Sequence, residues 1–202
     1  MRPAMIVRSI KLLPAGLAMA TLAGCISFGA PAPPTLLTLT AATPLTPGQT
    51  SNSANTSTIT IQLPSVPAAI ATAHVPVQTS PTSIAYVKDA QWAEPPARLF
   101  ARLLADTIGA KTGRVVLTPA QSLYDPGARL GGELRNFGID AETSEAVVTY
   151  DATLSRTDAK TIEKRRFEAR TPIGSVTPEN CSEAINAAAN QVAAEVADWV
   201  GK

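Results

Sequence analysis

The residues with the clearest chemistry are Leu22, Ala23, Gly24 and Cys25, which directly follow an apolar run. A cysteine thiol is nucleophilic and can be alkylated with diacylglycerol, and the small residues before it suit cleavage by a signal peptidase. Residues 1–21 carry three basic side chains and no acidic one, and Leu, Ala, Met and Gly dominate their second half. This basic, apolar, small order is typical of a bacterial export signal, and the run is shorter than the about 20 apolar residues that cross a bilayer.

The sequence therefore predicts a lipoprotein signal peptide over residues 1–24 and lipidation of Cys25. The alternative is an ordinary secretory signal that happens to contain a cysteine, but Ile26 and Ser27 offer it no Ala-x-Ala cleavage site. One acyl chain holds a protein only marginally, so stable anchoring requires more than one chain. The mature protein would begin at Cys25 and be attached to a membrane by its own N-terminus.

Composition narrows the class of protein further. Cleavage before Cys25 removes three basic residues and leaves 178 residues with 14 basic and 16 acidic side chains. This balance lacks the strongly basic surface that nucleic acid requires, so we expect no nucleic-acid partner. No second apolar run approaches transmembrane length, and we expect one compact domain of ordinary size.

Cys181 is the second cysteine of the chain. If Cys25 carries lipid, no intramolecular disulfide can form. Cys181 is predicted to lie in the first turn of the last helix, where the helix dipole could lower the pKa of the thiol. We favour the alternative, in which Cys181 is a small apolar packing residue.

Residues 25–57 differ in composition from the rest of the chain. They contain no charged side chain and are rich in Pro, Ala, Thr, Ser, Leu and Gly. Such a stretch buries too little apolar surface to offset the entropy lost on ordering. We therefore predict a tether over 25–57 and a folded domain over 58–202. Within the tether, Thr35–Thr40 could form an edge strand of the domain.

Periodicity in the domain predicts both strands and helices. Alternation over two residues predicts strands at 58–63 and 83–87. Recurrence at three and four residues predicts an amphipathic helix that starts at Pro95–Pro96 and stops at Gly113. Its apolar face would consist of Leu99, Phe100, Leu103, Leu104, Thr107 and Ile108. A strand over 114–118 follows, so this strand–helix–strand run suggests a right-handed crossover.

Residues 129–170 are predicted to form an antiparallel meander. Slips in the alternation indicate a bulge near Asn136 and a second irregularity around Lys164-Arg165-Arg166, a basic run that we interpret as a solvated strand edge. A final helix begins at Pro178, after the capping residue Thr177. The pattern predicts a single α/β domain with a mixed, mostly antiparallel sheet of about six strands and two long amphipathic helices packed on it.

The domain shows no residue pattern for catalysis or metal binding. Its single histidine, His74, falls in a Pro-rich loop, with no Gly-x-Ser-x-Gly elbow and no second His. Gly131-Gly132 falls within a predicted strand and lacks the context of a phosphate-binding loop. Four acidic residues fall in predicted turns, where Asp and Glu are common for structural reasons: Asp125, Asp140, Glu142 and Asp158. We therefore predict that the protein is not an enzyme and has no catalytic, cofactor-binding or metal-binding residue.

Trp92 is conspicuous because aromatic residues make up only 4% of the chain. It lies just before the first predicted helix, where it could pack on the first turn as a hydrophobic staple. A direct contact with a ligand or partner is the alternative. We favour the structural role, because Pro95-Pro96 points a preceding aromatic side chain back toward the helix.

Several of these motifs follow one another in an order that resembles the ABC-type transport auxiliary lipoprotein family (paraquat-inducible lipoprotein C-like). After the lipobox and a Thr/Pro linker come a strand ending in Leu63-Pro64 and the segment Trp92-Ala93-Glu94-Pro95, which opens a helix containing Arg-Leu-Leu-Ala. The resemblance continues through 132–139 and 197–200 and covers about residues 58–201. Relatives carry an aromatic pair soon after the lipid cysteine, where this chain has Leu36-Leu37.

The resemblance implies a non-catalytic, lipid-anchored auxiliary component of a lipid-transporting (Mce-type) ABC system that supports transport between the inner and outer membranes. Its implied partner is the periplasmic substrate-binding (Mce-domain) subunit, with lipid and a homo-oligomer left open. Ile26 after Cys25 favours the periplasmic face of the outer membrane, because Asp is the usual inner-membrane retention signal there. The alternatives are an envelope hydrolase acting on cell wall or lipid, and an independent periplasmic lipid carrier.

Overall fold

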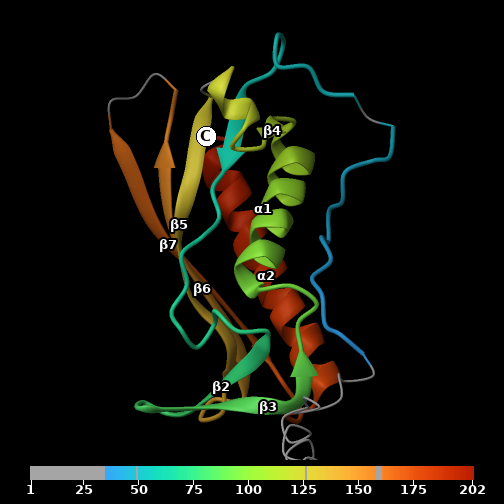
Figure 1. The fold of residues 1–202 in the computed structure, drawn as a ribbon, viewed down its shortest axis with the longest axis vertical. Helices are drawn as coiled ribbons and strands as arrows, with labels where there is room; N and C mark the ends of the chain where they lie inside the picture. Colours follow the sequence, from blue (N-terminus) through green and yellow to red (C-terminus); the bar gives the residue numbers. More distant parts are fainter. Residues whose placement is uncertain (1–34, 49, 126, 158–160) are drawn as a thin grey trace, which may run out of the picture. The chain divides into compact units, whose positions relative to one another are not determined.

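The computed structural model describes residues 35–202 apart from 49, 126 and 158–160, so Cys25 lies outside the described residues. These residues form a seven-stranded sheet with two helices packed on it (Figure 1). The elements are β1 (Thr58–Ile61), β2 (His74–Ser80), β3 (Ser83–Gln91), α1 (Pro96–Thr112), β4 (Val115–Leu117), the 3₁₀ turn η1 (Gln121–Leu123), β5 (Ala128–Asp140), β6 (Glu145–Ser155), β7 (Ile162–Pro172) and α2 (Pro178–Val200). The predicted α/β fold is confirmed, with one more strand than expected.

Strand β5 is the longest strand and organises the sheet. One of its edges pairs antiparallel with β6 from end to end, and β6 pairs in turn with β7. Its other edge pairs with two parallel strands, β1 at the start of β5 and β2 at its end. β4 joins β1 in parallel, and β3 joins β2 antiparallel.

The crossover predicted around the first helix is wrong. β3 enters α1 and α1 leads to β4, but β3 pairs only with β2 and runs opposite to the parallel set of β1, β2, β4 and β5. The two strands that flank α1 therefore lie at the two ends of the strand path and point in opposite directions. This topology was not predicted, because β2, which joins β3 to the rest of the sheet, was predicted as a loop.

The missed strand β2 begins at His74 and contains a proline. Pro76 cannot donate a backbone hydrogen bond, which made the segment read as a Pro-rich loop. The structure accommodates it with a register shift between His74 and Pro76 in the β2–β3 pairing. Val75 and Val77, two positions apart, both enter the core, and Pro76 between them is buried as well.

The predicted bulge at Asn136 is confirmed, whereas the second predicted slip is wrong. The β5–β6 register shifts between Leu134 and Asn136. Leu134 and Phe137 are three positions apart and would face opposite sides of a regular strand, but with the bulge both enter the helix-covered core. β7 pairs with β6 in continuous register from Ile162 to Pro172. The apparent slip in β7 arises because Ile162, which looks like a core residue, is 66% exposed.

Both predicted helices form, with the expected ends. α1 buries the whole predicted apolar face and stops at Gly113, whose φ of 67° is left-handed and favours glycine. α2 starts after Thr177, whose side chain accepts a hydrogen bond from the Asn180 N–H, and Pro178 occupies its first turn. A buried stripe of alanines and valines along α2 allows close packing against α1 and the sheet (Figure 1).

The first described residues lie along the body. We call residues 37–45 the docked segment. Leu37 is buried and forms one isolated parallel bridge with Trp92, which is what remains of the predicted edge strand. Two asparagines one turn apart on α2 hold the backbone that follows. The Thr40 N–H donates to Asn186 Oδ1 (3.0 Å) and the Ala42 N–H donates to Asn190 Oδ1 (2.7 Å).

Aromatic side chains form the centre of the core. The Trp92 ring lies 5.3 Å from Phe137, and Phe100 lies 5.2 Å from Tyr150. The Tyr150 hydroxyl donates to the Gly131 carbonyl at 2.7 Å, so this buried polar group is satisfied. Trp92 is only 2% exposed, which supports the structural role, and its observed aromatic partner belongs to β5.

Truncating Trp92 should be strongly destabilising. We expect Trp92→Ala to lower the free energy of unfolding by about 3 to 5 kcal/mol, because a large buried ring is replaced by a cavity. A chemical or thermal unfolding curve measures this. Leu123→Ala, at a position that is 83% exposed, is the control and should change stability by less than about 0.5 kcal/mol. An unchanged melting temperature for Trp92→Ala would refute the structural role.

Candidate functional site

The face of the sheet opposite the helices carries most of the organised polar side chains of the domain. On β5, β6 and β7 these residues alternate with those that enter the core, as expected for strands with one buried face. We call this surface the helix-free face. Its polar members are Glu133, Arg135, Asn136, Asp140, Glu145, Thr149, Asp151, Lys164, Arg166, Glu168 and Arg170.

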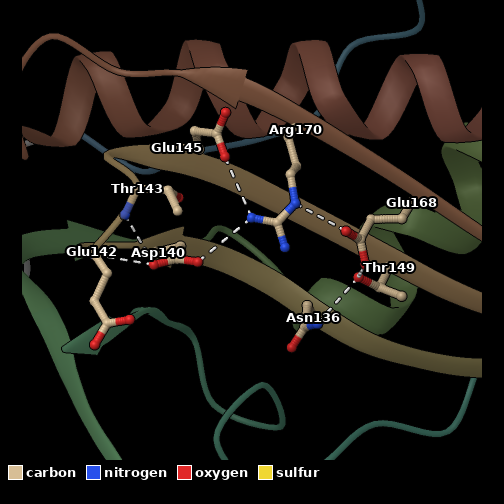
Figure 2. A network of polar contacts seen from close by, with 8 residues as sticks. All are labelled: Asn136, Asp140, Glu142, Thr143, Glu145, Thr149, Glu168 and Arg170. Carbon is tan, nitrogen blue, oxygen red and sulfur yellow. Dashed lines mark hydrogen bonds and ion pairs between the residues drawn. The ribbon is translucent and has the colours of Figure 1, made fainter. Parts of the chain in front are cut away.

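Arg170 is the hub of one network on this face, which Figure 2 shows from close by. Its guanidinium contacts Glu168 at 2.9 Å, Glu145 at 3.3 Å and Asp140 at 3.5 Å. The Thr149 hydroxyl donates to Glu168 at 2.9 Å. One arginine thus connects carboxylates from three strands, which are brought together only by the pairing of β5, β6 and β7.

The network favours the charged forms of Glu168 and Arg170. Burial alone would raise the pKa of Glu168, but hydrogen bonds from Arg170 and Thr149 outweigh it and lower that pKa. The hydrogen bond that Arg170 donates to Glu168 raises the pKa of Arg170. These side chains are therefore held ionised and paired, which favours a fixed recognition surface over proton transfer.

A second ion-paired cluster lies further along the same face. Arg166 on β7 forms two hydrogen bonds with the Asp151 carboxylate on β6, at 2.6 and 2.7 Å. Arg135, on the bulge of β5, lies 3.7 Å from Asp151 and 3.6 Å from Glu133. The hydrogen bond from Arg166 lowers the pKa of Asp151.

A groove of about 380 Å³ opens beside the Arg170 network, and we call it the hairpin groove. One wall is mostly apolar and comes from the turn before β2 and from the β2–β3 hairpin: Pro67, Ala69, Ile70, Pro76, Pro81 and Ile84. The opposite wall is charged: Arg135, Asp140, Glu142 and Arg170. Val147, only 6% exposed, also lines the groove. The groove therefore offers apolar contact and fixed charge within one concave surface.

A glycine sets the depth of this groove. A Cβ atom at Gly138 would lie 2.3 Å from the carbonyl oxygen of Pro76, so a larger residue there would force β2 away from β5. β2 meets β5 at Val77 and Ile139, next to this contact. The missing side chain lets the hairpin wall approach the sheet.

The structure scatters the residues that the sequence singled out. His74 is exposed, with its ring 5.6 Å from Tyr86. Asp125 accepts a hydrogen bond from the Thr58 hydroxyl at 3.0 Å. Asp140 ends β5 and accepts backbone hydrogen bonds from the following turn, as its turn role predicts. Asp158 lies outside the described residues.

The remaining candidates have structural positions. Cys181 is fully buried, and burial raises the pKa of its thiol, which fits the packing role and not an activated thiol. Gly132 lies in β5 with a φ of 145°, where a Cβ would meet the Asp151 carbonyl. The basic run 164–166 lies on β7, which pairs only with β6 in the described sheet, so the predicted strand edge is confirmed.

Sequence reasoning did not find Arg170. Its partners are separated from it by up to 30 positions and meet only through the strand register. Among the described residues, no group of three or more His, Cys, Asp and Glu side chains is arranged to hold a metal ion. None of the described helices combines the length and apolarity needed to cross a membrane.

The fold and the groove define a class of protein: a single α/β domain with one helix-covered face and one grooved, ion-paired face. The family model of the ABC-type transport auxiliary lipoprotein component matches residues 37–197, so the chain belongs to this family of auxiliary lipoprotein components of ABC-type transport systems. The family resemblance seen in the sequence is confirmed. No curated protein gives a significant match.

Two solved structures share the fold. Protein XCC0632 from Xanthomonas campestris, assigned to family-model DUF330, is 20% identical with a TM-score of 0.68, covering 82% of this chain and 94% of that chain. An uncharacterized protein is 16% identical with a TM-score of 0.62, covering 72% of this chain and 93% of that chain. At such identities the likeness concerns the fold alone.

The Asp151–Arg166 pair makes a testable prediction about pH. Arg166→Gln should raise the pKa of Asp151 toward the usual aspartate value, because it removes the charged hydrogen-bond donor. A carboxyl whose pKa is lowered on folding stabilises the fold above its unfolded pKa, and this contribution is lost as the pH falls through the folded pKa. NMR titration of the side-chain carboxyl measures the shift.

Lys164→Gln is the matched control, since it removes a positive charge two residues away on the same strand. It should leave the titration of Asp151 close to that of the parent protein. An Asp151 titration that is the same in Arg166→Gln and in the parent would show that the pair does not set this pKa.

Proposed function

We propose that this chain is a non-catalytic, lipid-anchored auxiliary component of a lipid-transporting, Mce-type ABC system that supports transport between the inner and outer membranes. The match of the family model over residues 37–197 carries the proposal. The lipobox ending at Cys25 supports the anchor. The paired state of the carboxylates on the helix-free face supports a binding role, since general acid catalysis favours a raised carboxyl pKa.

The partner in this proposal is the periplasmic substrate-binding (Mce-domain) subunit, and the hairpin groove is its binding surface. The opposite face of the sheet is covered by α1 and α2, and Trp92, which precedes α1, is buried. The groove combines an apolar wall with arginine and carboxylate groups held in place by ion pairs. Preorganised side chains of this kind lower the entropy lost on binding.

The proposed location is the periplasmic face of the outer membrane, through lipid on Cys25. We expect Cys25→Ser to release the protein from both membranes, because it removes the thiol that would carry the acyl chains. Membrane fractionation followed by immunoblotting measures this. Ser27→Ala, two residues further on, is the control and should stay in the membrane fraction. Retention of Cys25→Ser would refute the lipid anchor, and cofractionation of the parent with inner-membrane markers would refute the location.

The proposed partner surface can be tested by filling the groove. Ala69 lines the groove, and its neighbour Ala68 is exposed and does not. We expect Ala69→Trp to reduce copurification of the Mce-domain subunit at least about tenfold, since a large side chain there occludes a packed contact, as at interface hot spots. Ala68→Trp, the control, should copurify normally.

Equal recovery of the subunit with both variants would exclude the groove as the contact. Recovery of no ABC permease, ATPase or substrate-binding subunit with the parent protein would remove the main support for the transport function. Copurified lipid in the isolated monomer would favour the independent lipid carrier. Hydrolysis of cell-wall or lipid substrates by the purified protein would favour the envelope hydrolase.

A further inference from the structure

Charge is distributed very unevenly along the chain. Residues 12–87 contain no Asp, Glu, Lys or Arg, so β1, β2 and the first five residues of β3 carry no such charge. The charged residues of the described body begin with Lys88 and Asp89, and those that follow build the ion-paired clusters of β5 to β7. The β2–β3 hairpin thus carries no such charge up to Val87, and Lys88 and Asp89 are the first exposed charges on β3.

The docked segment begins beside the C-terminal end of β3. The Leu37 N–H donates to the Gln91 carbonyl at 2.8 Å, and the Ala93 N–H donates to the Leu37 carbonyl at 2.9 Å, so Leu37 is tied to the end of β3. Figure 1 shows the described chain starting (blue) near β3 and running beside the helices toward the other end. The described chain therefore begins beside the end of β3.

Docking also shortens the connection to the lipid. A free tether over residues 25–57 could extend about 120 Å, at the 3.6 Å per residue of a fully extended chain. With Leu37 and the two asparagine contacts in place, Thr35 follows Cys25 by ten positions, and this connection spans at most about 36 Å. The anchor thus holds one particular end of the body close to the membrane.

The side chains exposed at this end suit a lipid surface. Tyr86 on β3 is 45% exposed and Leu36, next to the docked segment, is 52% exposed. Tyrosine is enriched at membrane interfaces, because it joins an apolar ring to a polar hydroxyl group. Residues 74–87 of the hairpin also avoid the desolvation cost that charged groups incur when they approach hydrocarbon.

We infer that the docked segment holds the β2–β3 end of the body against the surface of the membrane that carries the lipid anchor, with Tyr86 and Leu36 in the headgroup region. The inference rests on the proposed lipidation of Cys25. It leaves the hairpin groove available to a protein partner, because Tyr86 and Leu36 do not line that groove.

Depth-dependent quenching of a fluorescent label tests this orientation. The full lipidated chain carries Tyr86→Cys, labelled with an environment-sensitive dye, in phosphatidylcholine–phosphatidylethanolamine vesicles that contain brominated lipid. The native Cys181 is fully buried and does not compete for the dye. We expect the brominated lipid to reduce the fluorescence about twofold, because the label would lie at the headgroup–acyl boundary.

Leu123→Cys is the control. Leu123 is 83% exposed and is the last residue of η1, near the start of β5, whereas the hairpin pairs with the end of β5 about 40 Å away at 3.3 Å per residue. Its label should not be quenched. Absence of quenching at position 86, or equal quenching at both positions, would overturn the inference. A blue shift at position 86 that also occurs in detergent and rises with protein concentration would overturn it in favour of a second copy of the chain.

Releasing the docked segment tests the mechanism. Asn186→Ala combined with Asn190→Ala removes the side chains that hold Thr40 and Ala42. This double variant should lose most of the quenching at position 86 and still float with the vesicles. Unchanged quenching would overturn docking as the cause of the orientation. Flotation and the mass of the lipidated N-terminus, measured on the same samples, separate failure of this inference from failure of the proposed anchor.

Discussion

The pairing along β5 is the constraint on which the rest of the structure depends. This 13-residue strand forms a ladder with β6, interrupted by one bulge, on one edge and holds two parallel strands, β1 and β2, on the other. The bulge at Asn136 changes which residues face the core halfway along the strand, so that Leu134 and Phe137 both pack inward. The missing side chain at Gly138 then lets β2 approach closely enough to form the groove wall. Core, groove and charged face therefore share one strand.

The two faces of this sheet follow different physical rules. Toward the helices, burial of apolar side chains such as Phe100 and Ile185 supplies the stability of the domain. On the other face, partly exposed ion pairs centred on Arg170 and Arg166 contribute little stability each, because solvent screens them. Their organisation is better explained by a requirement for a fixed pattern of charge, which the family's role as an auxiliary transport component would use in recognition.

Much of the fold could be predicted because its signals are local. Both helices could be predicted from the prolines at their starts, the left-handed glycine after α1 and the threonine cap before α2. The bulge at Asn136 was visible as a break in alternation. β2 was missed because a proline such as Pro76 is more typical of a loop than of a strand. The predicted topology around α1 was wrong as a consequence. The Arg170 network and the groove could not be predicted, since Asp140, Glu145 and Arg170 meet only after three strands have adopted their register.

The hydrogen bonds between α2 and the docked segment have a mechanical consequence. Any pull that reaches the body through its N-terminal connection arrives first at Leu37, whose backbone pairs with β3, and then at the two contacts made by Asn186 and Asn190. The segment runs along the helices, so a pull in line with it loads these hydrogen bonds in shear. The docked segment can thus detach from the body before the force unfolds the aromatic core. The body could then travel further from its point of attachment and remain folded.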